Sequence, residues 1–185
     1  MAAELAPLIG MRGAWKWTRA ELTIGEVRNF CETAEDANPI YWDEETARAS
    51  RFGRFIAPPQ SLLSTAMWRW WLPDYVRRQE AEELAKQESD GDPERRVWDI
   101  LTSYGYSTPA ASHRKEEYFE AFGPGDGRLR YSIKVENVSA VKQTKLGPGV
   151  FITTSVDYRT EFGDRLVARA SLELLRFRAR EEVAS

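Results

Sequence analysis

The chain has 185 residues, a formal net charge of -3 and 42% hydrophobic residues, so it can bury one core and lacks the basic excess of a nucleic-acid-binding domain. One cysteine, Cys31, excludes an internal disulfide and a cysteine metal cluster, and one histidine, His113, excludes any site that needs two. No apolar run approaches the roughly 20 residues of a membrane span, and the start lacks a signal peptide. We therefore expect one soluble, cytoplasmic domain over residues 1–185, with no metal site.

The chain opens with two short structural signals. After a loose lead-in over residues 1–13, Trp15 and Trp17 flank a lysine, which predicts a short extended segment. Thr23 and Glu26 then have the spacing of a capping box, in which each side chain bonds the other residue's backbone N–H. A helix is therefore predicted to begin directly after Thr23.

This first helix should end near Asp36, because the following Asn38-Pro39 disfavours further helix. Cys31 lies on its apolar face, and we interpret it as a small buried filler, with a reactive thiol as the alternative. Asp43 is a good N-cap, so a second short helix is predicted over residues 44–50.

A long apolar helix is predicted to begin at Pro58-Pro59, because proline is favourable at the first helical position. Apolar residues cover most of its circumference, so the helix should be buried. Its apolar face comprises Leu62, Leu63, Ala66, Met67 and Trp70. Further tryptophans flank this face. We interpret them as core or interface packing, and a platform that stacks on a ligand is the alternative.

The second half of the chain is predicted to form an antiparallel sheet. Residues 76–96 are charged and polar, which indicates an exposed helical insertion. The apolar period then changes to two, as is typical of half-buried strands. Strands are predicted over residues 112–122, 129–136, 150–158 and 166–174, with turns at 123–127, 146–149 and 162–164. The first of these strands carries His113, which we expect to be exposed.

The simplest packing wraps this long antiparallel β-sheet around the one central apolar α-helix. That α+β arrangement is the hotdog fold, with a core over about residues 14–178. A single hotdog leaves an edge strand unpaired, so two such units usually join edge to edge.

Two motifs then carry a family resemblance. Asp36–Arg48 has the form D-x-N-P-I-(H/Y)-x-D-E-x-x-A-R, and Ile56–Pro59 opens the central helix with I-A-P-P. Together with the order of elements, they resemble the MaoC-like dehydratases, in particular the MaoC dehydratase N-terminal branch. The resemblance implies hydration of trans-2-enoyl thioesters of CoA or acyl-carrier protein to (R)-3-hydroxyacyl products, or the reverse dehydration. It implies no cofactor beyond that thioester carrier.

The sequence departs from the family's active form at two places. Active members use an aspartate and a histidine as general base and acid, and Tyr41 stands at that histidine's position. A phenol, with an ordinary pKa of about 10, is a poor base at neutral pH. Active members also polarise the thioester carbonyl with a backbone N–H at the start of the central helix. That position reads Ala57-Pro58-Pro59, and proline has no N–H.

The resemblance therefore implies a non-catalytic subunit that shapes an acyl pocket beside a catalytic hotdog partner, as a heterodimer or a dimer of heterodimers. Its degenerate catalytic positions would be Asp36, Asn38 and Tyr41, although Asp36 could instead simply cap its turn. Its pocket wall would comprise Ala57, Pro58, Pro59, Leu63, Met67 and Trp70.

Two alternatives stay open. One is a self-sufficient homodimeric hydratase or dehydratase that uses Asp36 and Tyr41. The other is a module that binds acyl thioesters without turnover. The tryptophan-rich helix suits a bulky, ring-containing acyl group but also suits a dimer interface, so fatty-acid and steroid metabolism both stay open. Finally, the arginines of residues 48–54 are candidates for contacts to CoA phosphates, with a plain solvated face as the alternative.

Overall fold

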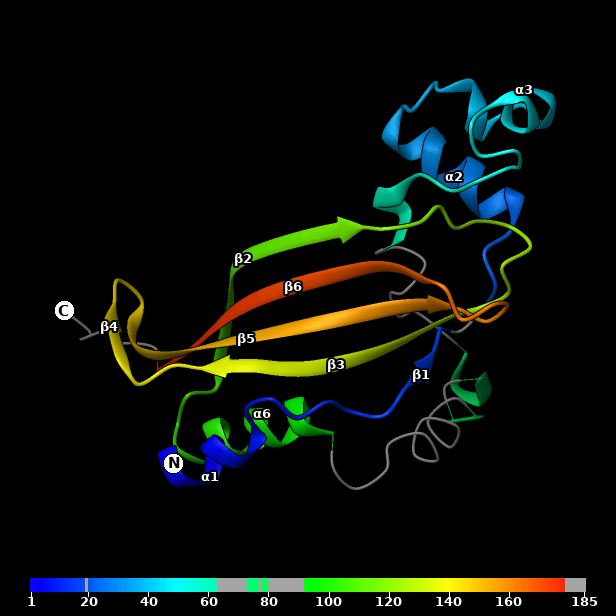
Figure 1. Cartoon of the computed structure of the whole chain (residues 1–185). Coiled ribbons are helices and arrows are strands. Elements are labelled where there is room, and N and C mark those ends of the chain that lie inside the picture. The colour runs from blue at the N-terminus through cyan, green and yellow to red at the C-terminus, as the bar shows by residue number, and fades with distance from the viewer. Residues whose placement is uncertain (19, 63–72, 77, 80–91, 179–185) are drawn as a thin grey trace.

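The computed structural model describes residues 1–18, 20–62, 73–76, 78–79 and 92–178. A long antiparallel sheet forms its body, with α2 and α3 at one end and α1 and α6 at the other (Figure 1). The helices are α1 Ala2–Leu5, α2 Ile24–Ala34, α3 Glu44–Ala49 and α6 Pro93–Ser103, with short 3-10 turns η1 Ala6–Leu8, η2 Pro39–Tyr41 and η3 Pro59–Ser61. The strands are β1 Lys16–Trp17, β2 Thr108–Tyr118, β3 Leu129–Val138, β4 Lys142–Thr144, β5 Gly147–Thr160 and β6 Leu166–Phe177.

The sheet follows the order β1-β3-β5-β6-β2, and every pairing in it is antiparallel. The predicted meander is therefore confirmed, because the three long strands β3, β5 and β6 pair in their chain order, with only the short β4 between β3 and β5 in the sequence. Strand β2 lies at one edge, paired with β6 along its length apart from a bulge between Ala111 and His113. Among the described helices, none is long and apolar enough to cross a membrane.

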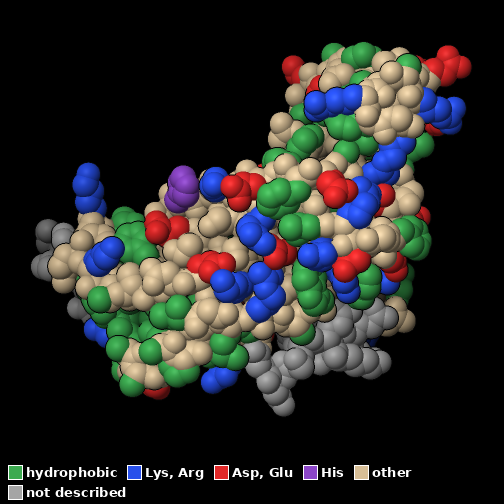
Figure 2. Space-filling model, in the orientation of Figure 1, with side chains coloured by type: hydrophobic (Ala, Val, Ile, Leu, Met, Phe, Trp, Pro, Cys, Tyr) green, Lys and Arg blue, Asp and Glu red, His purple; other side chains and the backbone are tan. Residues whose placement is uncertain are grey.

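The two faces of the sheet differ in chemistry. Residues paired directly across strands share a face, so Tyr131, Tyr158, Ala168 and Tyr118 form one row on what we call the inner face. Both buried clusters lie on this face: one packs it against α2 and the following turns, the other against α6 and α1. The outer face carries mixed charges (Figure 2). At its centre Asp157 accepts hydrogen bonds from Arg169 and forms a 3.0 Å ion pair with Arg12.

Two parts of the chain before β2 differ from the sequence prediction. The lead-in over residues 1–13 is not loose, because Leu5 and Leu8 are buried against α6. Residues 93–103 form helix α6, so the last part of the predicted insertion over 76–96 belongs to a packed helix. Most of the rest of that insertion, and the body of the predicted central helix, lie outside the described residues.

The predicted turn at 146–149 is also displaced. Gly147 already belongs to β5, because Lys142 and Thr144 of β4 pair with Gly149 and Gly147. A β-carbon on Gly149 would lie 2.6 Å from Leu175 Cδ1. The glycine that suggested a turn is therefore required by close packing within a strand.

The capping box at the start of α2 forms as predicted. Thr23 Oγ1 accepts from the Glu26 N–H at 3.2 Å, and Glu26 Oε2 accepts from the Thr23 N–H at 2.9 Å. We expect Thr23→Ala to lower the free energy of unfolding by about 1 kcal/mol, because the Glu26 N–H loses its acceptor and the Glu26 carboxylate loses the Thr23 hydroxyl. Chemical denaturation measures this loss. Thr33→Ala near the end of the same helix is the matched control, and an equal loss in both variants would contradict the expectation.

Candidate functional site

The first site segment is the turn that follows α2. Glu35 ends the helix in a left-handed conformation, with φ at 54°. Asp36 Oδ1 then accepts from the Asn38 N–H at 3.0 Å, and Asn38 Oδ1 accepts from the Ile40 N–H at 3.3 Å. The indole N–H of Trp42 donates to the Asp36 carbonyl at 2.7 Å. Both polar side chains of the D-x-N-P motif are therefore engaged in shaping the turn itself.

Tyr41 is packed in the core and is only 8% exposed. Burial raises the pKa of its phenol, and the nearby Asp36 carboxylate raises it further. Cys31 is fully buried in the same cluster, and burial and Asp36 likewise raise the pKa of its thiol. Both groups therefore stay protonated at neutral pH, so neither can act as a base or nucleophile without a large change in environment.

An open hollow of about 460 Å³ lies beside Asp36. Its lining comprises Cys31, Glu32, Glu35, Asp36, Ala37, Pro39 and Trp42. The lining contains carboxylates but no imidazole.

His113, as predicted, is exposed. It lies opposite Glu173 of β6 on the outer face of the sheet, whereas α2 and the turns after it pack on the inner face. The Asp–His pair of an active member is therefore not assembled by these residues.

The second site segment, Ile56–Pro59, leads into the region of the predicted central helix. Ala57 and Pro58 are buried, and Pro59 begins the 3-10 turn η3, while the long helix predicted to begin here lies mostly outside the described residues. The Ala57 N–H donates to the Phe122 carbonyl at 2.8 Å. Since two prolines follow, Ala57–Pro59 offers no unused N–H to an oxyanion. Of the other predicted wall residues, Leu63, Met67 and Trp70 lie outside the described residues.

The arginines between residues 48 and 54 have partners within the chain. Arg48 pairs with Glu44 at 2.8 Å, and the Arg51 guanidinium lies 4.7 Å from the centre of the Phe52 ring. Arg54 donates to Asp126 at 2.7 Å and to the Ala121 carbonyl at 3.0 Å. Arg54 is therefore the least suited of the three to bind a phosphate, because its partner carboxylate is buried and its guanidinium also donates to a backbone carbonyl, whereas the Arg48–Glu44 pair is exposed.

Strand β2 adds a polar group that the sequence analysis missed. Arg114, Glu116 and Tyr118 pair in register with Leu172, Ala170 and Ala168, so they lie on the inner face at the edge of the sheet. Arg114 Nε donates to Glu116 Oε1 at 2.8 Å, and the Tyr118 hydroxyl donates to Glu116 Oε2. Partial burial opposes ionisation, but these bonds from Tyr118 and Arg114 lower the pKa of Glu116 below its ordinary value. Strict alternation along β2 is the signal that would have placed all three residues on one face.

Similarity to known proteins establishes the family of this chain. A family model described as the FAS1-like dehydratase domain region matches residues 8–169. The chain belongs to this MaoC-like dehydratase family. A protein of Thermomonospora curvata named "Probable enoyl-CoA hydratase alpha subunit" is 33% identical over 160 residues, which is 86% of this chain and 46% of that protein. A Mycobacterium tuberculosis protein named "3-oxo-4,17-pregnadiene-20-carboxyl-CoA hydratase alpha subunit" is 27% identical over 82% of this chain and 43% of its own length.

This chain of the MaoC-like family thus spans about half the length of the curated relatives it matches. Among solved structures, a chain of the ChsH1-ChsH2 complex from Mycobacterium tuberculosis superposes with a TM-score of 0.79 at 23% identity, over 96% of this chain and 95% of that one. A MaoC-like dehydratase from Rhodospirillum rubrum superposes with a TM-score of 0.52 at 18% identity, over 93% and 94% of the two chains. These likenesses confirm the predicted hotdog fold.

Proposed function

We propose that this chain is the pocket-forming hotdog subunit of an enoyl-thioester hydratase or 3-hydroxyacyl dehydratase, and that a partner hotdog supplies the catalytic pair. The observation that carries the proposal is a retained D-x-N-P turn in which Tyr41 stands at the histidine position and Ala57–Pro59 has no free N–H. Membership of the MaoC-like family supports the reaction class, and the alpha-subunit names of both relatives support a heteromeric enzyme.

The chemistry of hydration explains why the missing histidine and the missing free N–H both matter. Hydration bonds the oxygen of water to C3 of the enoyl thioester and delivers a proton to C2. One group must therefore deprotonate the water, and a donor must stabilise negative charge on the thioester oxygen. In this chain Tyr41 stays a neutral phenol, and the Ala57 N–H is already bonded to Phe122. The chain can contribute surfaces that hold the acyl group, while the proton transfers fall to the partner.

The edge strand β2 is the surface we assign to that partner. Its eleven residues, Thr108–Tyr118, pair with β6 on one side, and most of their side chains are exposed. An edge strand of this length offers a row of backbone donors and acceptors to an incoming strand. A partner joined there would lie beside Arg114, Glu116 and Tyr118 on the inner face, so these residues would border a shared pocket.

For the substrate, we propose a CoA thioester with a bulky acyl group. The relative whose name specifies a steroid-derived acyl-CoA supports this choice over a short linear chain. The tryptophan-rich sequence after Pro59 is compatible with a wide apolar wall. A fully buried, unpaired Cys31 is compatible with a reducing compartment, which supports the cytoplasmic location we propose.

The decisive experiment compares the chain alone with the chain co-expressed with a hotdog protein that has an intact D-x-N-P-x-H, encoded beside it. We expect trans-2-enoyl-CoA hydration only in the complex. Replacing the partner's aspartate should reduce kcat by about 100-fold or more. Asp36→Ala and Tyr41→Phe in this chain should change kcat by less than about threefold.

Two other outcomes would overturn the proposal. Turnover by the chain alone that is lost in Tyr41→Phe would establish the self-sufficient homodimeric enzyme instead. Saturable acyl-CoA binding, with no turnover beside any hotdog partner, would establish a binding module. Oligomeric state in solution, measured by light scattering on the same samples, distinguishes the homodimer from the heteromer.

A further inference from the structure

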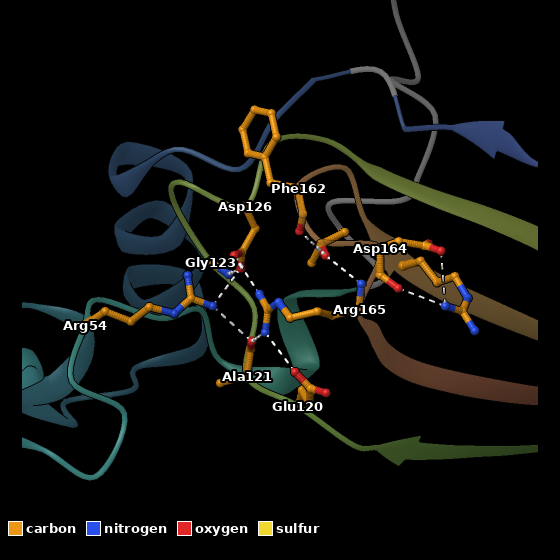
Figure 3. Close-up of polar contacts among 10 residues, drawn as sticks. Arg54, Glu120, Ala121, Gly123, Asp126, Phe162, Asp164 and Arg165 are labelled. Atoms are coloured by element: carbon orange, nitrogen blue, oxygen red, sulfur yellow. Dashed lines mark hydrogen bonds and ion pairs between the residues drawn. The ribbon is translucent and has the colours of Figure 1, made fainter.

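One buried carboxylate, outside the D-x-N-P motif, joins three distant parts of the chain. Asp126 lies in the turn between β2 and β3 and is only 7% exposed. Its Oδ2 accepts from the Gly123 N–H at 2.9 Å and from Arg54 Nη2 at 2.7 Å. Its Oδ1 accepts from Arg165 Nη2 at 2.6 Å. We call Arg54, Gly123, Asp126 and Arg165 the Asp126 hub (Figure 3).

The two arginines of the hub also share a second acceptor. Both donate to the Ala121 carbonyl, Arg54 at 3.0 Å and Arg165 at 3.3 Å. Arg165 further donates to Glu120 at 3.0 Å. Two guanidinium groups are thus balanced by two carboxylates in a partly buried site, so each charge keeps a partner. Such a network is costly to disrupt in part, because removing one member leaves the others unpaired.

The hub borders the wall segment Ile56–Pro59 directly. Arg54 enters the hub two residues before Ile56. On the other side, the Phe122 carbonyl, next to Gly123, accepts from the Ala57 N–H at 2.8 Å. A β-carbon on Gly123 would lie 2.8 Å from Ile56 Cα, so the two backbones are in contact. The start of the wall is therefore held by a side chain before it and by a backbone bond within it.

We propose that the Asp126 hub sets the position of the Ile56–Pro59 wall, which makes Asp126 a positioning residue for binding of the acyl group. This inference rests on the function proposed above. Binding energy for an apolar acyl chain depends on close packing, so a small displacement of the wall should weaken binding. The hub contains none of the groups to which we assign the proton transfers, so it should affect KM rather than kcat.

The test replaces Asp126 with asparagine, which keeps the shape of the side chain but removes its charge. Asp164→Asn is the matched control, because Asp164 is an exposed acid on the neighbouring β5–β6 turn that pairs with Arg130 and Arg159 away from the wall. In the reconstituted complex, we expect Asp126→Asn to raise KM for a bulky enoyl-CoA by about tenfold and to change kcat by less than about threefold. Arg165→Met should have a similar effect, and Arg165→Lys should restore part of the loss.

A second readout needs no turnover. Hydrogen exchange at the Ala57 amide should accelerate by about 10-fold or more in Asp126→Asn, because the Ala57–Phe122 bond loses its support. Exchange in Asp164→Asn should match the wild type. If Asp126→Asn lowers only the melting temperature, with Ala57 exchange and KM unchanged, the hub is purely stabilising and the proposal is wrong. If the complex has no hydratase activity, the proposed function fails, and the exchange measurement still decides whether the hub positions the wall.

Discussion

Replacing Gly123 with alanine is expected to lower the free energy of unfolding by about 3 kcal/mol, the upper end of what overpacking costs. The new β-carbon would lie 2.8 Å from Ile56 Cα, 3.0 Å from the Ala57 nitrogen and 3.1 Å from the Ile56 carbonyl carbon. All three are backbone atoms, which cannot rotate away as a flexible side chain can. The wall must therefore move, or the hydrogen bond between Ala57 and Phe122 must stretch.

Chemical and thermal denaturation measure this loss, which should appear as a fall in melting temperature of about 10 °C for a chain of this size. Gly125→Ala in the same turn is the matched control. Nothing lies within 4 Å of a β-carbon there, but its φ of +91° strains any other residue. We expect that strain alone to lower the free energy of unfolding of Gly125→Ala by about 1 kcal/mol. Equal losses in the two variants would mean that contact with the wall costs no more than left-handed backbone strain, and would contradict this account.

Replacing Glu94 with glutamine is expected to stabilise the fold, and to do so more as the pH rises. Glu94 begins the first turn of α6, where burial, with a contribution from the charge of Asp92, raises its pKa from 4.5 to about 7. Lys16 opposes this rise but is already bonded to Asp92 at 2.5 Å. The folded state therefore binds a proton that the unfolded state has released between these two pKa values.

The direction of this pH dependence follows from the linkage between proton binding and folding. Because the folded-state pKa is raised, the wild type loses stability as the pH rises from about 4.5 to about 7, and the loss is complete above pH 7. A pKa shift of this size lowers the free energy of unfolding by at most about 3 kcal/mol. Denaturation of Glu94→Gln and wild type at pH 5 and pH 8 should give a difference that grows with pH. Glu45→Gln, an exposed acid in the first turn of α3, is the control. A pH-independent difference for Glu94→Gln would contradict this account.

Much of the fold was predictable because its signals are local. The alternation along β3, β5 and β6 reports the two faces of a sheet directly, and the Thr23–Glu26 pair marks a helix start within four residues. The packed lead-in was not predictable in this way. Leu5 and Leu8 are buried only because α6, far along the chain, lies over them. Their short helical turns carry too few residues to show a period.

The candidate site likewise has one part that was predictable from the sequence and two that were not. The D-x-N-P turn closes on itself through Asp36 and Asn38, so its sequence was enough to predict its shape. In β2, strongly charged residues obscured the inner position of Arg114 and Glu116, because charge usually marks the solvent face of a strand. The Asp126 hub was not predictable for a different reason, because Arg54 and Arg165 come from segments that meet only in the folded chain.

The residue types alone establish which catalytic groups are missing at position 41 and at residues 57–59. A tyrosine at the histidine position and two prolines at the helix start remove an imidazole and two N–H groups in any fold, because these are properties of the side chain and of the proline ring. The state of the groups that remain follows from how the chain folds. Tyr41 is buried as a neutral phenol, and the Ala57 N–H is bonded to Phe122. Both outcomes depend on contacts between residues distant in sequence, which form only when the sheet and the wall pack together.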